Sequence, residues 1–311
     1  MKKFLSKVLF ISLVILIIFI AFECLALTFI NEYSYKKNYL EEKGKGIKVL
    51  ILGHSHSAKG INPEVLGDSV FNMAISGRAH YYDAVLTERY LSKLKNLRCV
   101  IWPLGYAFEY YSYIYKVNKK CSTNSTIPIY QCMYEKYMNI SYEPFIPYQH
   151  WSLLVVHPHS FIQELSYEDF ERKNGCNRLG YEKKLLSERH DNWQESMLPS
   201  SIDYSHPDAP KARQEGIENF KRIAAACRNA NVRLVVISTP CYRTYRERMT
   251  ERGKREMMEC VDSMRSVYPA MEYYNFIADS RFTDDDFFDA SHVCDQGAEK
   301  LSKILKDTLN L

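Results

Sequence analysis

Hydrophobic positions are densest at the start of the chain, where Glu23 is the only charged residue within residues 8–30. At ~1.5 Å per residue, a helix of about 23 residues is roughly 35 Å long and can cross a hydrocarbon core of about 30 Å. Lys2, Lys3 and Lys7 precede this stretch. By the positive-inside rule they predict a cytoplasmic N-terminus and an exported remainder. We therefore expect a single-pass protein of the cytoplasmic membrane, attached through residues 8–30.

A cleaved signal peptide is the alternative, because residues 8–22 alone have the length of a secretory hydrophobic core. Cleavage requires small residues at fixed offsets, and residues 21–27 offer no good Ala-x-Ala site. Large apolar residues also precede Cys24, where a lipoprotein signal has small ones. We therefore expect an uncleaved signal anchor over residues 1–30, followed by a polar stalk over residues 31–47.

Beyond the stalk, short apolar runs alternate with helical patterns. Apolar, β-branched runs predict buried strands at residues 48–53, 69–72, 99–102, 232–238 and 272–276. Hydrophobic residues at helical spacing predict helices at residues 83–95, 213–229 and 298–309. The alternation predicts one α/β domain over residues 48–311, built around a mostly parallel sheet.

A Tyr-rich stretch at about residues 106–211 interrupts this alternation. We interpret it as an insertion or cap; a separate domain is less favoured, because the α/β pattern resumes after it. Ligands of parallel sheets bind beyond the carboxyl ends of the strands. We therefore expect the chemistry in the loops that follow Leu52, Asn72, Trp102, Ser238 and Phe276.

Ser55 lies in the loop after the first predicted strand, two residues beyond Gly53. A serine at this position is lifted above the sheet edge, close to backbone N–H groups that can bind an anion. Its hydroxyl becomes a nucleophile when a histidine takes its proton and a carboxylate orients that histidine. Asp289 and His292, in one turn before the last helix, supply both groups.

Two motifs at the ends of the α/β domain carry a family resemblance. They are a Gly-x-Ser block and an Asp-x-x-His block, with Gly53, Ser55, Gly60, Pro63, Asp289 and His292. This pattern resembles the SGNH (GDSL-type) hydrolase superfamily. The anchor and the segment 72–77 narrow the resemblance to its membrane-anchored branch, which includes the D-alanyl transfer protein of lipoteichoic acid biosynthesis and envelope-polysaccharide O-acyltransferases. The resemblance covers residues 48–105 and 212–311.

The resemblance implies a flavodoxin-like three-layer sandwich and a role for each motif residue. Ser55 would be the nucleophile, His292 the general base and Asp289 the residue that orients it. The backbone N–H groups of Ser55 and Gly77 would form the oxyanion hole. The family's Gly-x-Asn block is absent, because residues 102–106 are Trp-Pro-Leu-Gly-Tyr. The anchored branch commonly lacks that Asn too.

The function implied is that of a membrane-anchored, extracytoplasmic serine esterase or O-acyltransferase. It would act on acyl esters of a cell-envelope glycan or an acyl carrier through an acyl-serine intermediate, with a membrane-bound protein as acyl donor. A non-catalytic SGNH-like binding or scaffold protein of a polysaccharide-modifying complex is the alternative. The acyl group, the acceptor and the choice between transfer and hydrolysis stay open.

Other polar clusters give weaker predictions. His54 and His56 flank Ser55, but no carboxylate accompanies them, and side chains two residues apart in a turn rarely converge on a metal. The same holds for the more distant group of His150, His157 and His159. We therefore predict neither a metal site nor a cofactor.

Tyr242 and Tyr245 are weaker candidates for the substrate site. They follow the strand predicted at residues 232–238, at the edge of the sheet where the crevice is expected. On that placement alone, both are predicted to contact the substrate.

Composition narrows the function classes further. Lys and Arg number 41 against 37 Asp and Glu, a balance too even for a nucleic-acid-binding protein. The nine cysteines include no Cys-x-x-Cys pair, which argues against a zinc ribbon or a thioredoxin-like motif. An exported domain permits disulfides, and their pairing stays open.

Overall fold

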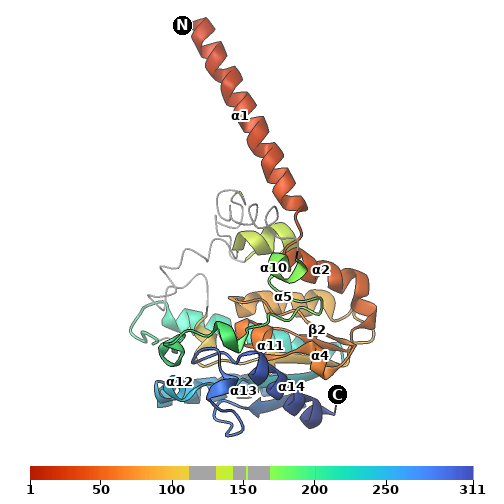
Figure 1. Cartoon of the computed structure of the whole chain (residues 1–311), viewed down its shortest axis with the longest axis vertical. Helices are drawn as coiled ribbons and strands as arrows, with labels where there is room; N and C mark the ends of the chain where they lie inside the picture. Colours follow the sequence, from red (N-terminus) through yellow and green to blue (C-terminus); the bar gives the residue numbers. More distant parts are fainter. Residues whose placement is uncertain (112–130, 143–151, 153–168, 200, 311) are drawn as a thin grey trace. The chain divides into compact units, whose positions relative to one another are not determined.

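In a computed structural model, the chain divides into two compact units (Figure 1). One unit contains residues 1–37 and 125–175, and the other contains residues 38–124 and 176–311. The structure describes residues 1–111, 131–142, 152, 169–199 and 201–310.

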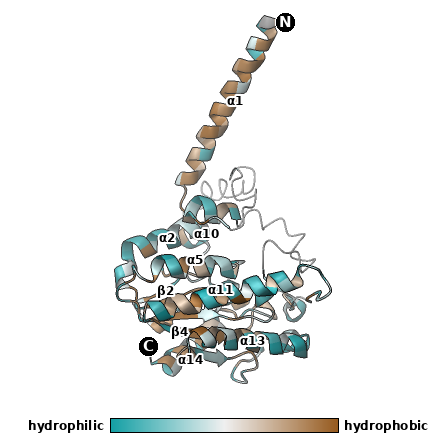
Figure 2. Cartoon of the chain, turned by 180° about the vertical axis from the view of Figure 1, so that it is seen from behind, coloured by the Kyte–Doolittle hydropathy of each residue, from teal (hydrophilic) through white to brown (hydrophobic). Residues whose placement is uncertain are grey.

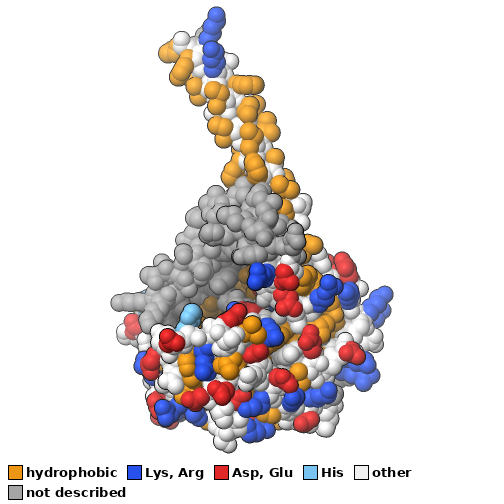
Figure 3. Space-filling model, in the orientation of Figure 1, with side chains coloured by type: hydrophobic (Ala, Val, Ile, Leu, Met, Phe, Trp, Pro, Cys, Tyr) orange, Lys and Arg blue, Asp and Glu red, His pale blue; other side chains and the backbone are white. Residues whose placement is uncertain are grey.

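The first unit begins with the long apolar helix α1 (Lys2–Thr28). Hydrophobic residues dominate this helix (Figure 2), and basic side chains lie at its N-terminal end (Figure 3). Among the described residues it is the one helix that is long and apolar enough to cross a membrane, over Lys3–Thr28. The predicted N-terminal hydrophobic helix is therefore confirmed, whereas its orientation stays a prediction.

Tyrosines of the predicted insertion pack beside the carboxyl end of α1 within this unit. The hydroxyl of Tyr137 donates a hydrogen bond to the carbonyl of Ala26 at 2.8 Å. The rings of Tyr33 and Tyr134 meet edge to face at 5.0 Å. The other described elements of the unit are the first half of α2 (Glu32–Lys43), the π-helical turn η3 (Tyr134–Met138) and α10 (Phe170–Asn174).

The predicted polar stalk is instead a helix, α2, followed by the turn η1 (Gly44–Gly46). Its second half belongs to the second unit, where Leu40 is buried and Tyr39 stacks on Phe71 at 3.9 Å. The apolar side chains among the charges therefore bind this segment to the α/β unit.

The second unit is built on a parallel sheet. In the part of the chain that the structure describes, five strands run in the order β2-β1-β3-β4-β5. They are β1 (Val49–Ile51), β2 (Val70–Asn72), β3 (Cys99–Pro103), β4 (Arg233–Ser238) and β5 (Glu272–Asn275). Every pairing is parallel, and β1 lies between β2 and β3. The predicted α/β class, strands and mostly parallel sheet are confirmed.

Helices cover both faces of this sheet (Figures 1 and 2). On one face, Leu301 and Leu305 of α14 (Asp295–Leu309) pack on Val49 and Ile51. On the other face, the ring of Trp102 lies 5.0 Å from that of Phe220 in α11 (Ala209–Asn229). The remaining helices are α3 (Ser55–Gly60), α4 (Pro63–Leu66), α5 (His80–Tyr90), α12 (Arg243–Glu247) and α13 (Glu251–Val267). Both faces of each central strand are therefore buried.

The stretch at about residues 106–211 does not behave as one cap. Its last part, from Cys176 onwards, belongs to the α/β unit and follows the edge of the sheet. The backbone N–H of Asn72 donates to the carbonyl of Leu179 at 2.9 Å, and that of Glu182 donates to the carbonyl of Ala58 at 2.9 Å. Residues 112–130, 143–151 and 153–168 lie outside the described residues.

The eight described cysteines are free thiols, and all except Cys24 are buried. Burial raises the pKa of Cys132 to about 11 and that of Cys241 to about 12. A thiol with so high a pKa carries little thiolate and reacts slowly. Cys121 lies outside the described residues.

Candidate active site

Ser55 is the first residue of α3, at the carboxyl end of β1. Gly53 makes the turn between them, with a φ of 109° that side-chain-bearing residues rarely adopt. A Cβ atom on Gly53 would also lie 2.3 Å from the ring carbons of Pro103. Glycine is therefore required here both by the backbone conformation and by the approach of β3.

Asn72, the last residue of β2, holds α3 in place. Its side-chain amide donates hydrogen bonds to the carbonyls of Ser57 at 2.9 Å and Ile61 at 3.0 Å. Its side-chain oxygen accepts from the backbone N–H of Ala74 at 3.0 Å. The sequence analysis did not predict this role, although an asparagine at the end of an otherwise apolar strand is a signal for it.

Asp83, buried in the first turn of α5, ties the three loops around Ser55 together. Its carboxylate accepts from the backbone N–H of Gly53 at 3.2 Å, Nη1 of Arg78 at 3.0 Å and Nε1 of Trp102 at 2.9 Å. Burial raises the pKa of Asp83, and these partners oppose that rise only in part. The sequence analysis predicted a role for neither Asp83 nor Arg78. The sequence signal that could have indicated one is a carboxylate on the side of a predicted helix that faces the sheet.

The structure brings Ser55, His292 and Asp289 into one hydrogen-bonded chain. Nε2 of His292 lies 2.8 Å from Oγ of Ser55. Nδ1 of His292 lies 2.9 Å from each carboxylate oxygen of Asp289. Asp289 and His292 are 7% and 3% exposed, so the hydrogen bonds between these two side chains are shielded from water.

A tight turn fixes the Asp289 carboxylate. Oδ1 accepts hydrogen bonds from the backbone N–H groups of Ser291 and His292, both at 2.9 Å. The hydroxyl of Ser291 lies 3.2 Å from the same oxygen. Burial works to raise the pKa of Asp289, but the hydrogen bonds and the adjacent imidazole outweigh it and hold the pKa below the ordinary value. The carboxylate is therefore ionised at neutral pH.

Tyr242 and Tyr245, the predicted substrate contacts, are buried beside this turn. They pack in a cluster with Trp193 and Phe287. The backbone N–H of Tyr242 donates to the carbonyl of Ala290 at 2.9 Å. Their contact with a substrate stays a prediction, whereas the role that the structure gives them is to support the Asp289 turn.

Gly77, the predicted oxyanion donor, lies in the turn after β2 with a φ of 78°. It directly precedes Arg78, which Asp83 links to the Ser55 loop. Its role as a donor, like that of the Ser55 N–H, stays a prediction. After β3, Gly105 lies against His54: a Cβ there would be 3.8 Å from Nε2 of that ring.

His54 and His56 contact each other beside Ser55. Their Nδ1 atoms lie 3.0 Å apart. Among the described residues, no group of three or more His, Cys, Asp or Glu side chains is arranged to hold a metal ion. His150, His157 and His159 lie outside the described residues.

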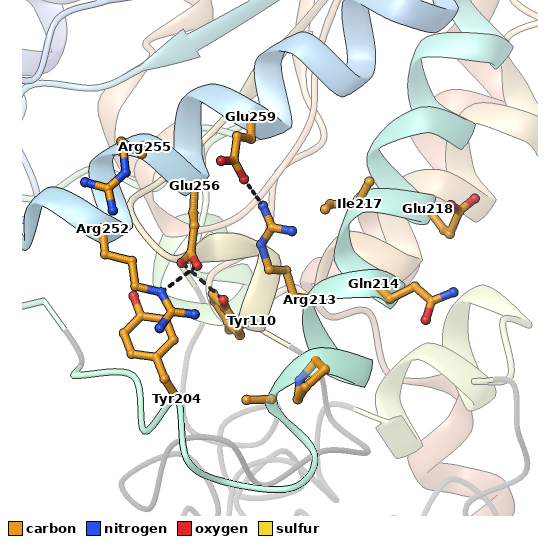
Figure 4. Close-up of a pocket in the computed structure, with 12 residues that line it drawn as sticks. Tyr110, Tyr204, Arg213, Gln214, Ile217, Glu218, Arg252, Arg255, Glu256 and Glu259 are labelled. Carbon is orange, nitrogen blue, oxygen red and sulfur yellow. Dashed lines mark hydrogen bonds and ion pairs between the residues drawn. The ribbon is translucent and has the colours of Figure 1, made fainter.

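A separate pocket of about 490 Å³ lies between α11 and α13 (Figure 4). Its charged side chains largely pair with one another: Arg213 with Glu259, and Arg252 with Glu256. Tyr110 also donates to Glu256, at 3.1 Å. Internal pairing of this kind engages four of the charged side chains without a ligand, whereas Nε of Arg213 is buried without a hydrogen-bond partner among the described residues.

No family model matches the chain, and no curated protein is similar enough in sequence to count as a relative. The chemistry of the site must therefore be argued from its geometry. A hydroxyl, an imidazole and an ionised carboxylate in series make a nucleophile, a base and an orienting group. This arrangement suits acyl transfer through a covalent intermediate.

Proposed function

We propose that this protein is a serine esterase or O-acyltransferase of the SGNH type, from its membrane-anchored branch. The observation that carries the proposal is the hydrogen-bonded chain from Ser55 through His292 to Asp289. The Gly-x-Ser and Asp-x-x-His motifs support it, as does the parallel α/β sheet with Ser55 beyond its first strand.

In the first half-reaction, Nε2 of His292 takes the proton of Ser55 while Oγ attacks the carbonyl carbon of an acyl ester. Asp289 holds the Nδ1–H and stabilises the imidazolium that forms. The backbone N–H groups of Ser55 and Gly77 are the proposed donors to the tetrahedral oxyanion. Collapse returns the proton from His292 to the leaving alkoxide and leaves an acyl-Ser55.

In the second half-reaction, His292 deprotonates an incoming hydroxyl, which attacks the acyl carbon and releases Ser55. The acceptor would be a hydroxyl of a cell-envelope glycan, or water. The apolar helix α1 supports a membrane anchor. The N-terminal lysines favour a catalytic unit on the outer face of the cytoplasmic membrane. The resemblance to the anchored branch implies that a membrane-bound protein donates the acyl groups. Transfer is preferred to hydrolysis by resemblance to the anchored branch.

The test is labelling of the full-length protein, in detergent micelles, with a fluorophosphonate probe. Wild-type protein should be labelled, and Ser55→Ala and His292→Ala should not. Release of p-nitrophenol from its acetate ester should fall to background in the same two variants. If folded wild-type protein neither binds the probe nor hydrolyses the ester, the enzyme proposal is wrong. The non-catalytic scaffold would then be favoured, in keeping with the missing Asn donor after β3.

A further inference from the structure

His56 directly follows the nucleophile, and its ring lies next to that of the general base. The ring centroids of His56 and His292 are 4.9 Å apart, and the rings are tilted by 33°. On its other side, Nδ1 of His56 lies 3.0 Å from Nδ1 of His54. The side chain is half-buried. The mechanism above gives this imidazole no role.

The contact between the two Nδ1 atoms requires one proton between them. If His56 carried it, His54 would be protonated on Nε2. That atom is buried and has no hydrogen-bond partner among the described residues. It faces carbon: Gly105 lies on one side, and the ring of Phe108 is 4.3 Å from that of His54. A buried N–H without an acceptor loses its hydrogen bond to water and is rarer than an unfilled lone pair.

The favoured arrangement therefore has the shared proton on Nδ1 of His54. Nδ1 of His56 then accepts, and the proton of His56 is on Nε2. Burial, together with His54, His292 and Lys59, lowers the pKa of His56 well below its ordinary value. Burial, with His292 next, lowers the pKa of His54 to about 3. Both imidazoles are thus neutral near pH 7, and the tautomer of one fixes that of the other.

We infer that His56 is a second catalytic imidazole: its Nε2–H donates a hydrogen bond to the ester or hydroxyl oxygen that exchanges a proton with His292. The inference rests on the proposed function. A neutral imidazole that donates a hydrogen bond is an established catalytic device. His56 lies beside His292 and not across the site from it. Its hydrogen bond is therefore assigned to the oxygen that exchanges a proton with His292, and not to the carbonyl oxygen.

The proton balance is simple, because His56 neither gains nor loses a proton. During attack on acyl-Ser55, the acceptor hydroxyl gives its proton to Nε2 of His292, and its oxygen bonds to the acyl carbon. A lone pair of the same oxygen accepts from His56, which fixes the direction of attack. In the reverse sense, His56 supports the departing alkoxide while His292 protonates it. His54 acts through His56 and is a positioning residue.

The inference predicts that loss of the donor affects some steps more than others. A fluorophosphonate loses fluoride and a p-nitrophenyl ester loses a stable anion. Because neither leaving group needs a hydrogen bond from His56 to depart, the covalent enzyme should form almost as fast without this side chain. Deacylation needs it, because water or an alcohol must attack. His56→Phe should therefore lower steady-state turnover of p-nitrophenyl acetate by ~10²-fold, a loss on the scale of that from removing one hydrogen-bond donor to an oxyanion. The burst of p-nitrophenol and the labelling rate should fall far less, and acyl-Ser55 should accumulate in the mass spectrum.

Matched variants separate this effect from a folding defect. His56→Gln, whose amide N–H reaches the place of Nε2, should recover at least tenfold of the lost turnover. His54→Asn, which keeps a donor at the place of Nδ1, should exceed His54→Phe in turnover. The exposed His190→Phe serves as the control.

Three outcomes would overturn the inference. Burst, labelling and turnover could fall in parallel in His56→Phe, as expected of a structural residue. Turnover could equal that of wild type. In either case labelled wild-type protein would leave the proposed function standing. A wild-type protein that is not labelled at all would overturn the proposed function together with this inference.

Discussion

Asp289→Asn tests the proton arrangement of the site with one changed atom. Oδ1 of Asp289 accepts hydrogen bonds from two backbone N–H groups, those of Ser291 and His292. An asparagine must place its amide oxygen at this position, because an NH₂ group there would face two donors. The NH₂ group then occupies the place of Oδ2, 2.9 Å from Nδ1 of His292.

The amide oxygen at the place of Oδ1 also lies 2.9 Å from Nδ1 and can still accept from it, but the NH₂ group competes by donating to Nδ1. When the NH₂ group donates, Nδ1 of His292 accepts a hydrogen bond instead of donating one. The imidazole proton moves to Nε2, which faces Ser55 at 2.8 Å and can then no longer take the serine proton. A triad with the wrong histidine tautomer loses ~10⁴-fold in rate. At ~1.36 kcal/mol for each factor of ten, this is about 5.4 kcal/mol of transition-state stabilisation.

The assay is kcat/KM for p-nitrophenyl acetate, together with the rate of fluorophosphonate labelling. Both should fall in Asp289→Asn, while thermal unfolding shows that the variant remains folded. Asp285→Asn, an exposed carboxylate four residues earlier, is the control and should behave as wild type. Activity of Asp289→Asn within about tenfold of wild type would refute the tautomer argument.

Three further outcomes are expected, each checked by thermal or urea unfolding. Gly53→Ala should lose ~2–4 kcal/mol of stability and most esterase activity, because its Cβ meets Pro103 at 2.3 Å and its φ is 109°. Asn72→Ala should lose ~2–4 kcal/mol, since it removes the hydrogen bonds of the Asn72 side chain to the carbonyls of Ser57 and Ile61 and to the N–H of Ala74; an unchanged urea midpoint would show that these hydrogen bonds to α3 contribute nothing. Burial raises the pKa of Glu109 to about 7. The folded state therefore binds more protons than the unfolded state between about pH 5 and 7, and stability falls as pH rises through that range. Glu109→Gln should remove this fall, and parallel Tm–pH curves for the two proteins would contradict it.

The strands and the meeting of Ser55 with His292 could be predicted because their signals are local. A run such as Val49–Ile51 has few alternatives to a buried strand, and topology carries the residues after the strands to one edge. The hydrogen bonds to the Asp289 carboxylate are equally local, since they come from Ser291 and His292.

The supporting groups could not be predicted because their partners are distant in the sequence. The role of Asp83 depends on the hydrogen bonds that it accepts from the backbone N–H of Gly53, thirty residues earlier, and from Trp102. The stalk prediction was wrong for a related reason. Charged residues dominate the sequence pattern of this segment, whereas Tyr39 stacks on Phe71 and Leu40 is buried only once the α/β unit has folded.

The packing of α2 has a practical consequence for anyone who wishes to work without detergent. A secreted fragment that starts at residue 48 would uncover Phe71 and remove Glu41, to which Tyr90 donates a hydrogen bond at 3.0 Å. Such a fragment should aggregate or express poorly. The cut belongs instead between Thr28 and Glu32, where the apolar helix has ended and α2 has not begun.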